Sequence, residues 1–410
     1  MRRVAITGLG VVSALGLGVE AFWEGLVAGR SGVRRITLFD PSALSIPIAA
    51  EVPDYDPSRH FAAKKLDLLD RFSQFALVAA AEAIRDANLN LEDRNREHCG
   101  AAMGTGMGGA TTEDEGYLNV YGRGAARVHP FTIPRLMHNA AAAQLSMEFG
   151  LQGPVLVYST ACASASHAIG EAGELIRNGR AEIMLAGGSE APVTFAVMKA
   201  WEAMRVMAPP PAGDPATACR PFSADRQGLV MGEGAAILVL EEWEAARRRG
   251  AKIHAELAGY AATADAGHIT QMSLQAPARA IRLALEQAGM TPQEIGYVNA
   301  HGTATRLNDA TETAILKDVF GEHARRLAVS STKSMHGHAM GASGALELVA
   351  ATLALEREIV PPTVNYTTPD PECDLDYVPN HARPARHTAA LSNSFAFGGL
   401  NAALVLKRAV

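Results

Sequence analysis

Cysteine is scarce in this sequence, and its spacing excludes two classes of small structural scaffold. The four cysteines are far apart and form no CxxC pair; they are Cys99, Cys162, Cys219 and Cys373. Such spacing fits neither a zinc ribbon nor a disulfide framework. We therefore expect free thiols in a reducing compartment.

Long runs of one charge and uninterrupted apolar spans are also missing. The longest basic run is 247–249 and the formal net charge is −6, which argues against a nucleic-acid partner. Segment 149–170 carries no formal charge, but Gln152, Pro154 and His167 make it too polar for membrane insertion. The opening residues MRRVAITGLG lack the apolar core of a signal peptide. We expect a cytoplasmic, soluble protein.

Internal repeats are the most informative feature that the sequence does contain. Three pairs of similar segments recur in the same order: AMGTG (102–106) with AHGTA (300–304), STACASASHAIG (from Ser159) with STKSMHGHAMGASG (from Ser331), and GEGAAILVLEE (from Gly232) with GGLNAALVLKR (from Gly398). A duplicated α/β half, fused head to tail, explains all three pairs. The seam is expected near 249–253, which divides the chain into residues 1–250 and 251–410.

Alternating strand and helix patterns agree with such a duplication. Apolar runs predict strands near 4–6, 155–158, 183–186, 237–240, 297–299, 327–330 and 404–406. Alternation of strands with helices implies sheets whose faces are covered by helices. Because the repeated segments would end at a shared centre, loops of both halves should meet there. This centre is where we expect the chemistry.

Cys162 is the candidate nucleophile. It lies between the apolar run VLVY and an Ala/Ser-rich helix, so a helix N-terminus would lower the pKa of its thiol. The alternative is a buried structural cysteine, a role that suffices for Cys99. The strand, turn and helix setting favours the nucleophile at Cys162.

Polar partners for this cysteine occur in the matching loops of the second half. One loop contains His301, with Asp309 and Glu312 just beyond it; the other contains Lys333, His336 and His338. A pair of histidines from corresponding loops is a plausible catalytic pair. The alternative is a metal site formed by the same histidines, but no acidic or cysteine ligand stands at short spacing to complete it. We therefore expect no metal.

Five motifs together closely resemble one family over essentially the whole chain. They are TGLGVVSALG at the start, STACAS around Cys162, NAHGTAT around His301, TKSMHGHAMGASGALE around Lys333 and His338, and SNSFAFGGLNAALVL near the end. The sequence is similar to the β-ketoacyl-acyl carrier protein synthases, especially the synthase II type. This resemblance implies a thiolase-like fold: α/β, with α-β-α-β-α layers and two pseudo-twofold halves.

The resemblance also implies a reaction, a decarboxylative Claisen condensation that elongates fatty acids. Cys162 would carry the acyl group, and the N–H groups of Cys162 and Phe397 would form an oxyanion hole. His301 and His338 would assist decarboxylation of malonyl-carrier protein. Lys333 and Glu347 would tune that site. No cofactor is expected, because phosphopantetheine arrives on the acyl carrier protein.

Further roles follow from the same resemblance. Phe397 would act as a gate, flanked by the flexible Gly398 and Gly399, and Met107 and Trp201 would line the acyl pocket. Ordinary core packing is the alternative for Met107 and Trp201. The candidates for the carrier-protein surface are Lys64, Lys65, Arg127 and Arg205, for which plain surface charge is the alternative. A monovalent cation near Asn299, Glu347 and Asn393 is a further implication.

Some positions depart from the synthase II pattern and leave the pathway open. His336 stands where Thr is frequent, and Asp67 and Leu68 stand where basic residues are common. The expected assembly is a homodimer. The alternatives are a ketosynthase of a type II polyketide or polyene pathway, paired with a non-identical subunit, and a non-catalytic scaffold subunit that shapes a partner's acyl tunnel. The intact set Cys162, His301, Lys333 and His338 argues against the scaffold.

Overall fold

The fold is organised by one large mixed sheet with two equivalent halves. In the computed structural model, which describes residues 2–409, an 11-stranded sheet has the order β11-β10-β14-β15-β9-β1-β8-β7-β5-β6, with β2 paired to β1. Its strands are β1 (Val4–Ser13), β2 (Gly16–Leu17), β5 (Cys99–Gly104), β6 (Val155–Tyr158), β7 (Ile183–Glu190), β8 (Gly234–Glu242), β9 (Ala255–Ala264), β10 (Tyr297–Asn299), β11 (Ala328–Ser330), β14 (Ala389–Ala396) and β15 (Leu400–Arg408). Two small sheets pair β3 (Arg34–Arg35) with β4 (Ile48–Ala49) and β12 (Ile359–Val360) with β13 (Arg383–Pro384).

The two halves repeat the same strand order. From the outer edge inward, β6, β5, β7, β8 and β1 correspond to β11, β10, β14, β15 and β9. Both sets have parallel pairs at the edge and antiparallel pairs toward the middle. The halves meet where β1 pairs with β9 over Ala5↔Glu256 and Ile6↔Ala255. This repetition confirms the predicted duplicated fold.

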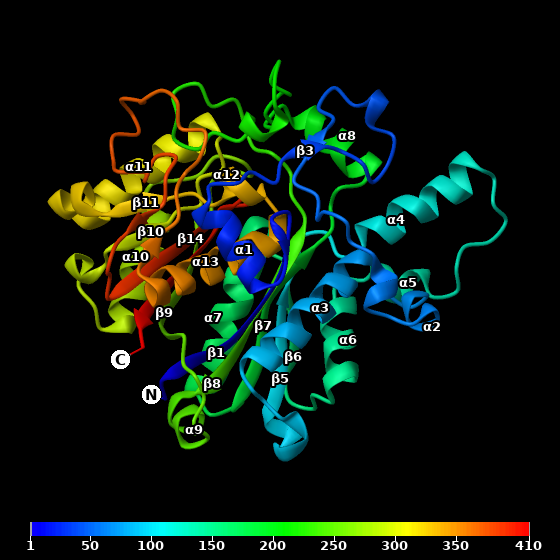
Figure 1. Ribbon diagram of the computed structural model, residues 1–410, viewed down its shortest axis with the longest axis horizontal. Helices are drawn as coiled ribbons and strands as arrows, with labels where there is room; N and C mark the ends of the chain where they lie inside the picture. Colours follow the sequence, from blue (N-terminus) through cyan, green and yellow to red (C-terminus); the bar gives the residue numbers. More distant parts are fainter. Residues whose placement is uncertain (1, 410) are drawn as a thin grey trace.

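Helices cover both half-sheets and fill the space between them. The helices are α1 (Val19–Val27), α2 (Ala63–Leu66), α3 (Arg71–Asp86), α4 (Ala110–Tyr117), α5 (Thr132–Leu136), α6 (Ala140–Phe149), α7 (Ser164–Arg177), α8 (Phe195–Met204), α9 (Trp243–Arg248), α10 (Gln275–Ala288), α11 (Arg306–Phe320), α12 (Lys333–His336) and α13 (Ser343–Arg357). In Figure 1, α7 and α13 lie centrally, with α3 and α6 on one side and α10 and α11 on the other. These are the five expected layers.

The central helix α13 has the composition that its position demands. Residues 343–355 are all buried, because apart from Glu347 this stretch is small or apolar on every face rather than on one stripe. It packs against α7 and against strands of both halves, including β8 and β14. Because it is buried between the two half-sheets, this helix fixes the loop before it, which carries His338, at the centre of the molecule.

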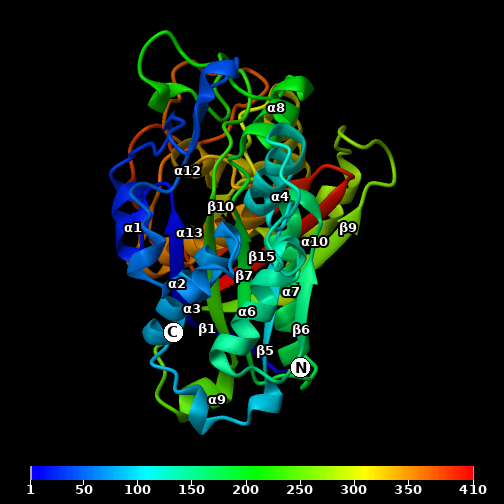
Figure 2. The same cartoon turned by 90° about the vertical axis from the view of Figure 1, so that its right-hand side faces the viewer.

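The loops at one end of the sheet converge on the candidate site. Figures 1 and 2 both show α8 and α12 at this end, with α9 at the opposite end. The turns after β5 and β6 leave the same edge of the first half-sheet, because these two strands are parallel. The turn after β10 meets them there, since His301 on this turn faces His338, which contacts Cys162 after β6. Among residues 2–409, no helix combines the length and the apolar composition needed to cross a membrane.

A buried histidine, His254, joins the two halves near the seam. Because its charge and those of its partners depend on pH, we expect the stability of the fold to depend on pH as well. His254 bonds Asp86 at 2.8 Å through Nε2 and Glu356 at 2.6 Å through Nδ1. Burial opposes the charge on His254, but both carboxylates outweigh it and raise the pKa of His254. Burial likewise works to raise the pKa of Glu356, yet hydrogen bonds from His254 and Lys252 lower it to about 2.

We expect the His254→Gln variant to lose about 2 kcal/mol of stability near pH 5.5. The charged imidazole stabilises fully below its unfolded pKa of about 6.5, and this contribution is lost as pH rises through the raised folded pKa. The two carboxylates contribute above about pH 4.5 and lose their contribution as pH falls. Thermal unfolding across pH should therefore show the largest difference between wild type and variant from about pH 4.5 to 6.5. A difference that grows toward alkaline pH would contradict this arrangement.

Candidate active site

Cys162 lies on a sharp turn between a strand and a helix. The turn is a 3-10 segment, Ala161–Ala163, that follows β6 and leads directly into α7. Ala161 has a φ of 49°, which is rare for a residue with a side chain and marks a strained turn. Ser164 Oγ accepts the N–H of Thr160 at 2.8 Å and closes the turn. The thiol therefore has a fixed position, as expected for a nucleophile.

The protonation state of Cys162 differs from the sequence prediction. Burial is the largest influence and raises the pKa of the Cys162 thiol to about 11. The Lys333 charge and hydrogen bonds from the N–H groups of Cys162 and Phe397 lower the pKa, but they do not offset burial. The predicted lowering was wrong, because the cysteine is 5% exposed and loses most of its hydration. The resting group is a thiol that needs a base.

His338 is placed to act as that base. Its Nε2 lies 3.0 Å from Cys162 Sγ, and Ser343 Oγ bonds its Nδ1 at 2.8 Å. Burial, followed by the charge of Lys333, holds the pKa of His338 well below its ordinary value. A neutral ring can take up the thiol proton during attack on a thioester.

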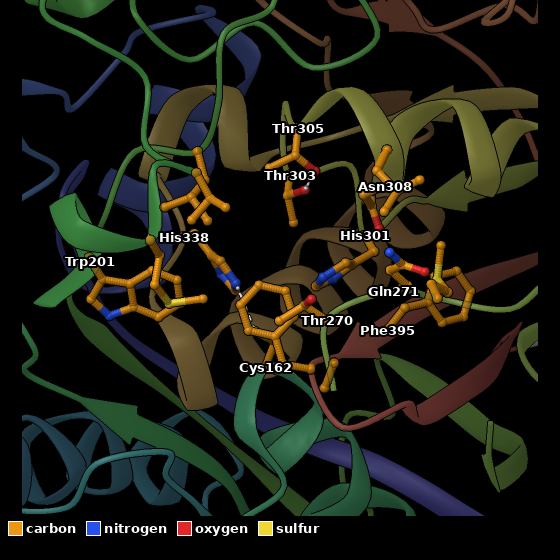
Figure 3. Close-up of a pocket in the computed structure, with 17 residues that line it drawn as sticks. Cys162, Trp201, Thr270, Gln271, His301, Thr303, Thr305, Asn308, His338 and Phe395 are labelled. Carbon is orange, nitrogen blue, oxygen red and sulfur yellow. Dashed lines mark hydrogen bonds between the residues drawn. The ribbon is translucent and has the colours of Figure 1, made fainter. Parts of the chain in front are cut away.

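His301 is the second neutral imidazole at the site. Its ring centroid is 5.7 Å from that of His338, at an interplanar angle of 86°. Burial and the nearby Lys333 charge hold the pKa of His301 well below the ordinary value. Lys333 Nζ lies 3.3 Å from His301 Nδ1, so Nδ1 accepts and Nε2 carries the proton. As Figure 3 shows, His301, His338 and Cys162 point into one space, where neutral N–H donors can stabilise an enolate.

Lys333 and Glu347 form a buried ion pair beneath this site. Lys333 is 1% exposed; it pairs with Glu347 and also donates to the carbonyl oxygen of His301 at 2.6 Å. Burial raises the pKa of Glu347 to about 7, against the lowering effect of Lys333. The pair therefore sets the position of His301 through its backbone and its ring.

Breaking this ion pair should be costly. We expect Glu347→Gln to destabilise the fold by about 3–5 kcal/mol, because it leaves the ammonium of Lys333 buried without a counter-charge. Urea unfolding measures the change. The double variant Lys333→Met/Glu347→Leu should lose less stability than the sum of the two single replacements. Strict additivity would contradict a direct pairing.

The two acidic residues predicted as supports differ in their placement. Glu312 accepts the backbone N–H groups of His301 and Gly302, each at 2.8 Å, and so anchors the turn that carries His301. Asp309 instead accepts the N–H of Phe222 at 2.7 Å and lies 3.7 Å from Arg226. Asp309 thus supports a neighbouring loop and does not touch the three reacting side chains.

A cavity of about 340 Å³ opens above the cysteine (Figure 3). Trp201 and Phe397 both line it, and their rings stack at 6.1 Å with an interplanar angle of 22°. Gly398 and Gly399, with φ of 84° and 69°, follow Phe397 and allow the sharp turn at this position. Met107, predicted to line the acyl pocket, lies on the turn after β5 and is not among the residues that line this cavity.

Several lining residues were not assigned from the sequence. Thr303 and Thr305 belong to the motif NAHGTAT, which was noted only for its histidine, and they line the cavity together with Thr270, Gln271 and Asn308. The residues around Thr270 come from the segment after β9, which has no counterpart in the repeats. Of these lining residues, only the threonines of the motif NAHGTAT could have been predicted from the sequence.

The four predicted carrier-protein contacts are distributed over three elements. Lys64 and Lys65 are in α2, Arg127 is in the segment between α4 and α5, and Arg205 ends α8. Lys64, Arg127 and Arg205 are exposed, whereas Lys65 pairs with Glu148. Their role remains a prediction.

The site also bears on metal binding. Within the described part of the chain, one set of side chains could hold an ion: the ligand atoms of Cys162, His301 and His338 lie within 4.8 Å of one another. His336, considered as a ligand from the sequence, instead bonds Thr332 Oγ1 at 3.0 Å. The ammonium of Lys333 beside His301 opposes a divalent cation there.

Four other oxygens bear on the monovalent cation that the resemblance implies. Asn299 Oδ1, Glu347 Oε2, Ser392 Oγ and Asn393 Oδ1 are buried and have no hydrogen-bond partner. Asn299 and Ser392 stand opposite each other in the β10–β14 ladder. Unpaired buried oxygens of this kind suit a hard cation, and Asn299, Glu347 and Asn393 would help to hold it.

Comparison with known proteins gives consistent matches along the chain. Residues 1–246 match the family "Beta-ketoacyl synthase, N-terminal domain", and residues 254–367 match "Beta-ketoacyl synthase, C-terminal domain". Nodulation protein E of a Rhizobium species is 46% identical over 410 residues, covering 99% of both chains. The 3-oxoacyl-[acyl-carrier-protein] synthase 2 of Staphylococcus aureus is 42% identical over 409 residues, covering 99% of this chain and 98% of that one. The solved ishigamide ketosynthase/chain length factor has a TM-score of 0.93 at 38% identity, with 100% of both chains covered.

Proposed function

Since the chain belongs to the β-ketoacyl synthase family, we propose that its Cys-His-His site performs the condensation of a 3-oxoacyl-[acyl-carrier-protein] synthase. The protein is an acyltransferase that joins an acyl group to the two-carbon unit of malonyl-carrier protein. The observation that carries the site assignment is the 3.0 Å contact between Cys162 Sγ and His338 Nε2 beside the neutral His301.

The first half-reaction loads the enzyme. Cys162 Sγ attacks the carbonyl carbon of the acyl-phosphopantetheine thioester, and His338 takes up the thiol proton. We assign the oxyanion hole to the N–H groups of Cys162 and Phe397. Both donate toward the sulfur and lower the pKa of the thiol, which supports this assignment. The bond from carbon to the pantetheine sulfur breaks, and the pantetheine thiol leaves with the proton.

The second half-reaction extends the chain. Malonyl-carrier protein enters the emptied site, and His301 and His338 donate hydrogen bonds to its thioester carbonyl. His338 does so in the tautomer that carries its proton on Nε2, in which Ser343 Oγ donates to Nδ1. The bond to the carboxylate breaks, carbon dioxide leaves, and the electron pair forms an enolate. The enolate carbon attacks the acyl-Cys162 thioester, the carbon–sulfur bond breaks, and the released Cys162 thiolate takes up a proton from water, because its earlier proton left with the pantetheine thiol. Decarboxylation generates the nucleophile, so no further base is required.

The surface of the first half suits both partners that this function needs. The segment formed by α4, α5 and the residues between them reaches out from the body in Figure 1, and Tyr121 and Ile133 on it are 83% and 61% exposed. Exposed apolar residues of this kind favour burial against a second subunit. Lys64, Arg127 and Arg205 offer positive charge to an acidic carrier protein. We place the enzyme in the cytoplasm, without a resident cofactor.

A heterodimeric ketosynthase of a polyketide pathway is the second candidate, because a solved structure of similar fold contains a ketosynthase and a chain length factor. The purified chain, given an acyl-carrier-protein donor and malonyl-carrier protein, distinguishes the two. We expect the 3-oxoacyl-carrier protein from this chain alone. Product that appears only after a second subunit is added would favour the heterodimer, and no product in either case would contradict the condensing function.

A further inference from the structure

Glu190 is a buried carboxylate that the catalytic account above does not use. It is the last residue of β7 and is 0% exposed. Its four donors are the hydroxyl of Thr105 and the N–H groups of Gly106, Met107 and Gly341, at 2.9, 2.6, 3.0 and 2.9 Å. Within residues 2–409 no basic side chain pairs with it, so these four hydrogen bonds alone compensate for its lost hydration.

The four donors come from two loops of different halves. Thr105, Gly106 and Met107 form the turn after β5 in the first half, whereas Gly341 lies three residues after His338 in the second half. The loops touch closely: a Cβ on Gly341 would lie 2.4 Å from the nitrogen of Gly106. A Cβ on Gly106 would lie 3.9 Å from Ala161 Cα, beside the nucleophile. The Glu190 carboxylate therefore joins the loops on either side of the catalytic cysteine.

The internal repeat indicates what such an anchor does. The turn after β10 corresponds to the turn after β5, and it is held in the same manner, by Glu312 accepting the N–H groups of His301 and Gly302. In the second half, a buried carboxylate thus fixes the turn that carries a catalytic histidine. In the first half, Glu190 has a similar role although it lies at the end of β7 rather than in a helix: it fixes the Met107 turn and additionally reaches across to Gly341.

His338 has anchors of its own, whereas the residues after it depend on Glu190. The N–H of His338 bonds the carbonyl oxygen of Val230 at 2.7 Å, its carbonyl oxygen accepts the N–H of Gly232 at 2.9 Å, and its ring bonds Ser343. Met340 adopts a φ of 45°, a conformation that the surroundings must enforce. The hydrogen bond from the N–H of Gly341 to Glu190 fixes the backbone directly after Met340.

We propose that Glu190 is a positioning residue that sets His338 against Cys162 and couples that contact to the turn at Met107, the residue predicted above to line the acyl pocket. Its effect on chain length rests on the proposed condensing function. Glu190→Gln tests the inference with little change of volume. Each carboxylate oxygen accepts two of the four donors, so an amide turned either way presents its NH₂ group to two donors.

The first readout needs no substrate. Iodoacetamide alkylation of Cys162, followed by intact mass, reports how readily His338 takes up the thiol proton. We expect the rate to fall about tenfold in Glu190→Gln. The matched control is Glu82→Gln, since Glu82 also accepts two backbone N–H groups, those of Val11 and Val19, but outside the site. This control should alkylate at the wild-type rate even if its melting temperature falls.

The second readout is the relative kcat/KM over saturated acyl-carrier-protein donors from acetyl to dodecanoyl. A loss of folded enzyme lowers the apparent kcat/KM for every donor by the same factor. A displaced Met107 turn instead changes the ratio of kcat/KM between short and long donors. Glu190→Gln should change this ratio, and Glu82→Gln should preserve it. If Glu190→Gln fails to fold, Thr105→Val removes one donor and should shift both readouts in the same direction by a smaller amount.

The outcomes separate the proposed condensing function from the proposed positioning role of Glu190. If wild type makes no product from any donor, the condensing function fails, but the alkylation comparison still decides whether Glu190 positions His338. If a folded Glu190→Gln protein alkylates at the wild-type rate and keeps the wild-type donor ratio, the inference is overturned.

Discussion

Replacing Cys162 by alanine is expected to abolish acyl loading and to reduce 3-oxoacyl product formation by about 10⁴-fold or more. The reason is that Cys162, among the four described cysteines, is the one whose sulfur bonds the catalytic His338. Acyl transfer from a radiolabelled acyl-carrier protein measures loading, and product analysis measures condensation. Cys219→Ala is the matched control, because this cysteine is also buried but bonds the Lys333 carbonyl oxygen instead.

The same variant separates an enzyme from a scaffold. His301, His338 and Lys333 remain in Cys162→Ala, so slow decarboxylation of malonyl-carrier protein should persist while loading is lost. A non-catalytic subunit that shapes a partner's tunnel would instead leave the activity of the assembled complex unchanged. Unchanged activity of Cys162→Ala would therefore contradict the role given to this cysteine.

Replacing His301 by alanine should have the second largest effect, on the other half-reaction. His301 does not contact the Cys162 sulfur in the way that His338 does, and its Nε2 proton points into the cavity. We expect malonyl decarboxylation and condensation to fall by about 10²–10⁴-fold, while acyl loading of Cys162 continues.

Carbon dioxide release and acyl-enzyme mass, measured on the same sample, test this separation. The acyl-enzyme should accumulate in His301→Ala, because its consumption is blocked. His323→Ala is a suitable control, since this histidine bonds the carbonyl oxygen of Ile295 away from the site. Equal loss of loading and decarboxylation in His301→Ala would contradict distinct roles for the two histidines.

Much of the fold was accessible from the sequence because the repeats are explicit. The seven strands predicted from apolar runs are present, and their duplicated order follows from the three recurring segments. Strands β5, β9 and β14 were not predicted as strands. Their sequences, CGAAMG, AELAGYAATA and AALSNSFA, are rich in Ala, Gly and Ser, which have little intrinsic preference for strands. Their pairing depends on neighbours that a local pattern does not reveal.

The sequence indicated which residues form the candidate site, but not the protonation state of its cysteine. The local setting of Cys162 and the matching loops of the repeat indicated Cys162, His301 and His338, and the resemblance to the family implied the role of Lys333; the structure brings these four residues together. The pKa of Cys162 was predicted in the wrong direction, because the helix N-terminus is visible in the sequence but the depth of burial is not. Glu190 was missed for a related reason: its four donors belong to segments far apart in the chain, so no local motif marks it.

The most direct test of the central claim is the intact mass of the protein before and after two additions. Incubation with an acyl-carrier protein should add one acyl mass, mapped to Cys162 by peptide analysis. Addition of malonyl-carrier protein should then remove that mass as a 3-oxoacyl-carrier protein forms and carbon dioxide is released. A stable acyl mass on another residue, or an acyl-Cys162 that malonyl-carrier protein does not discharge, would contradict the account.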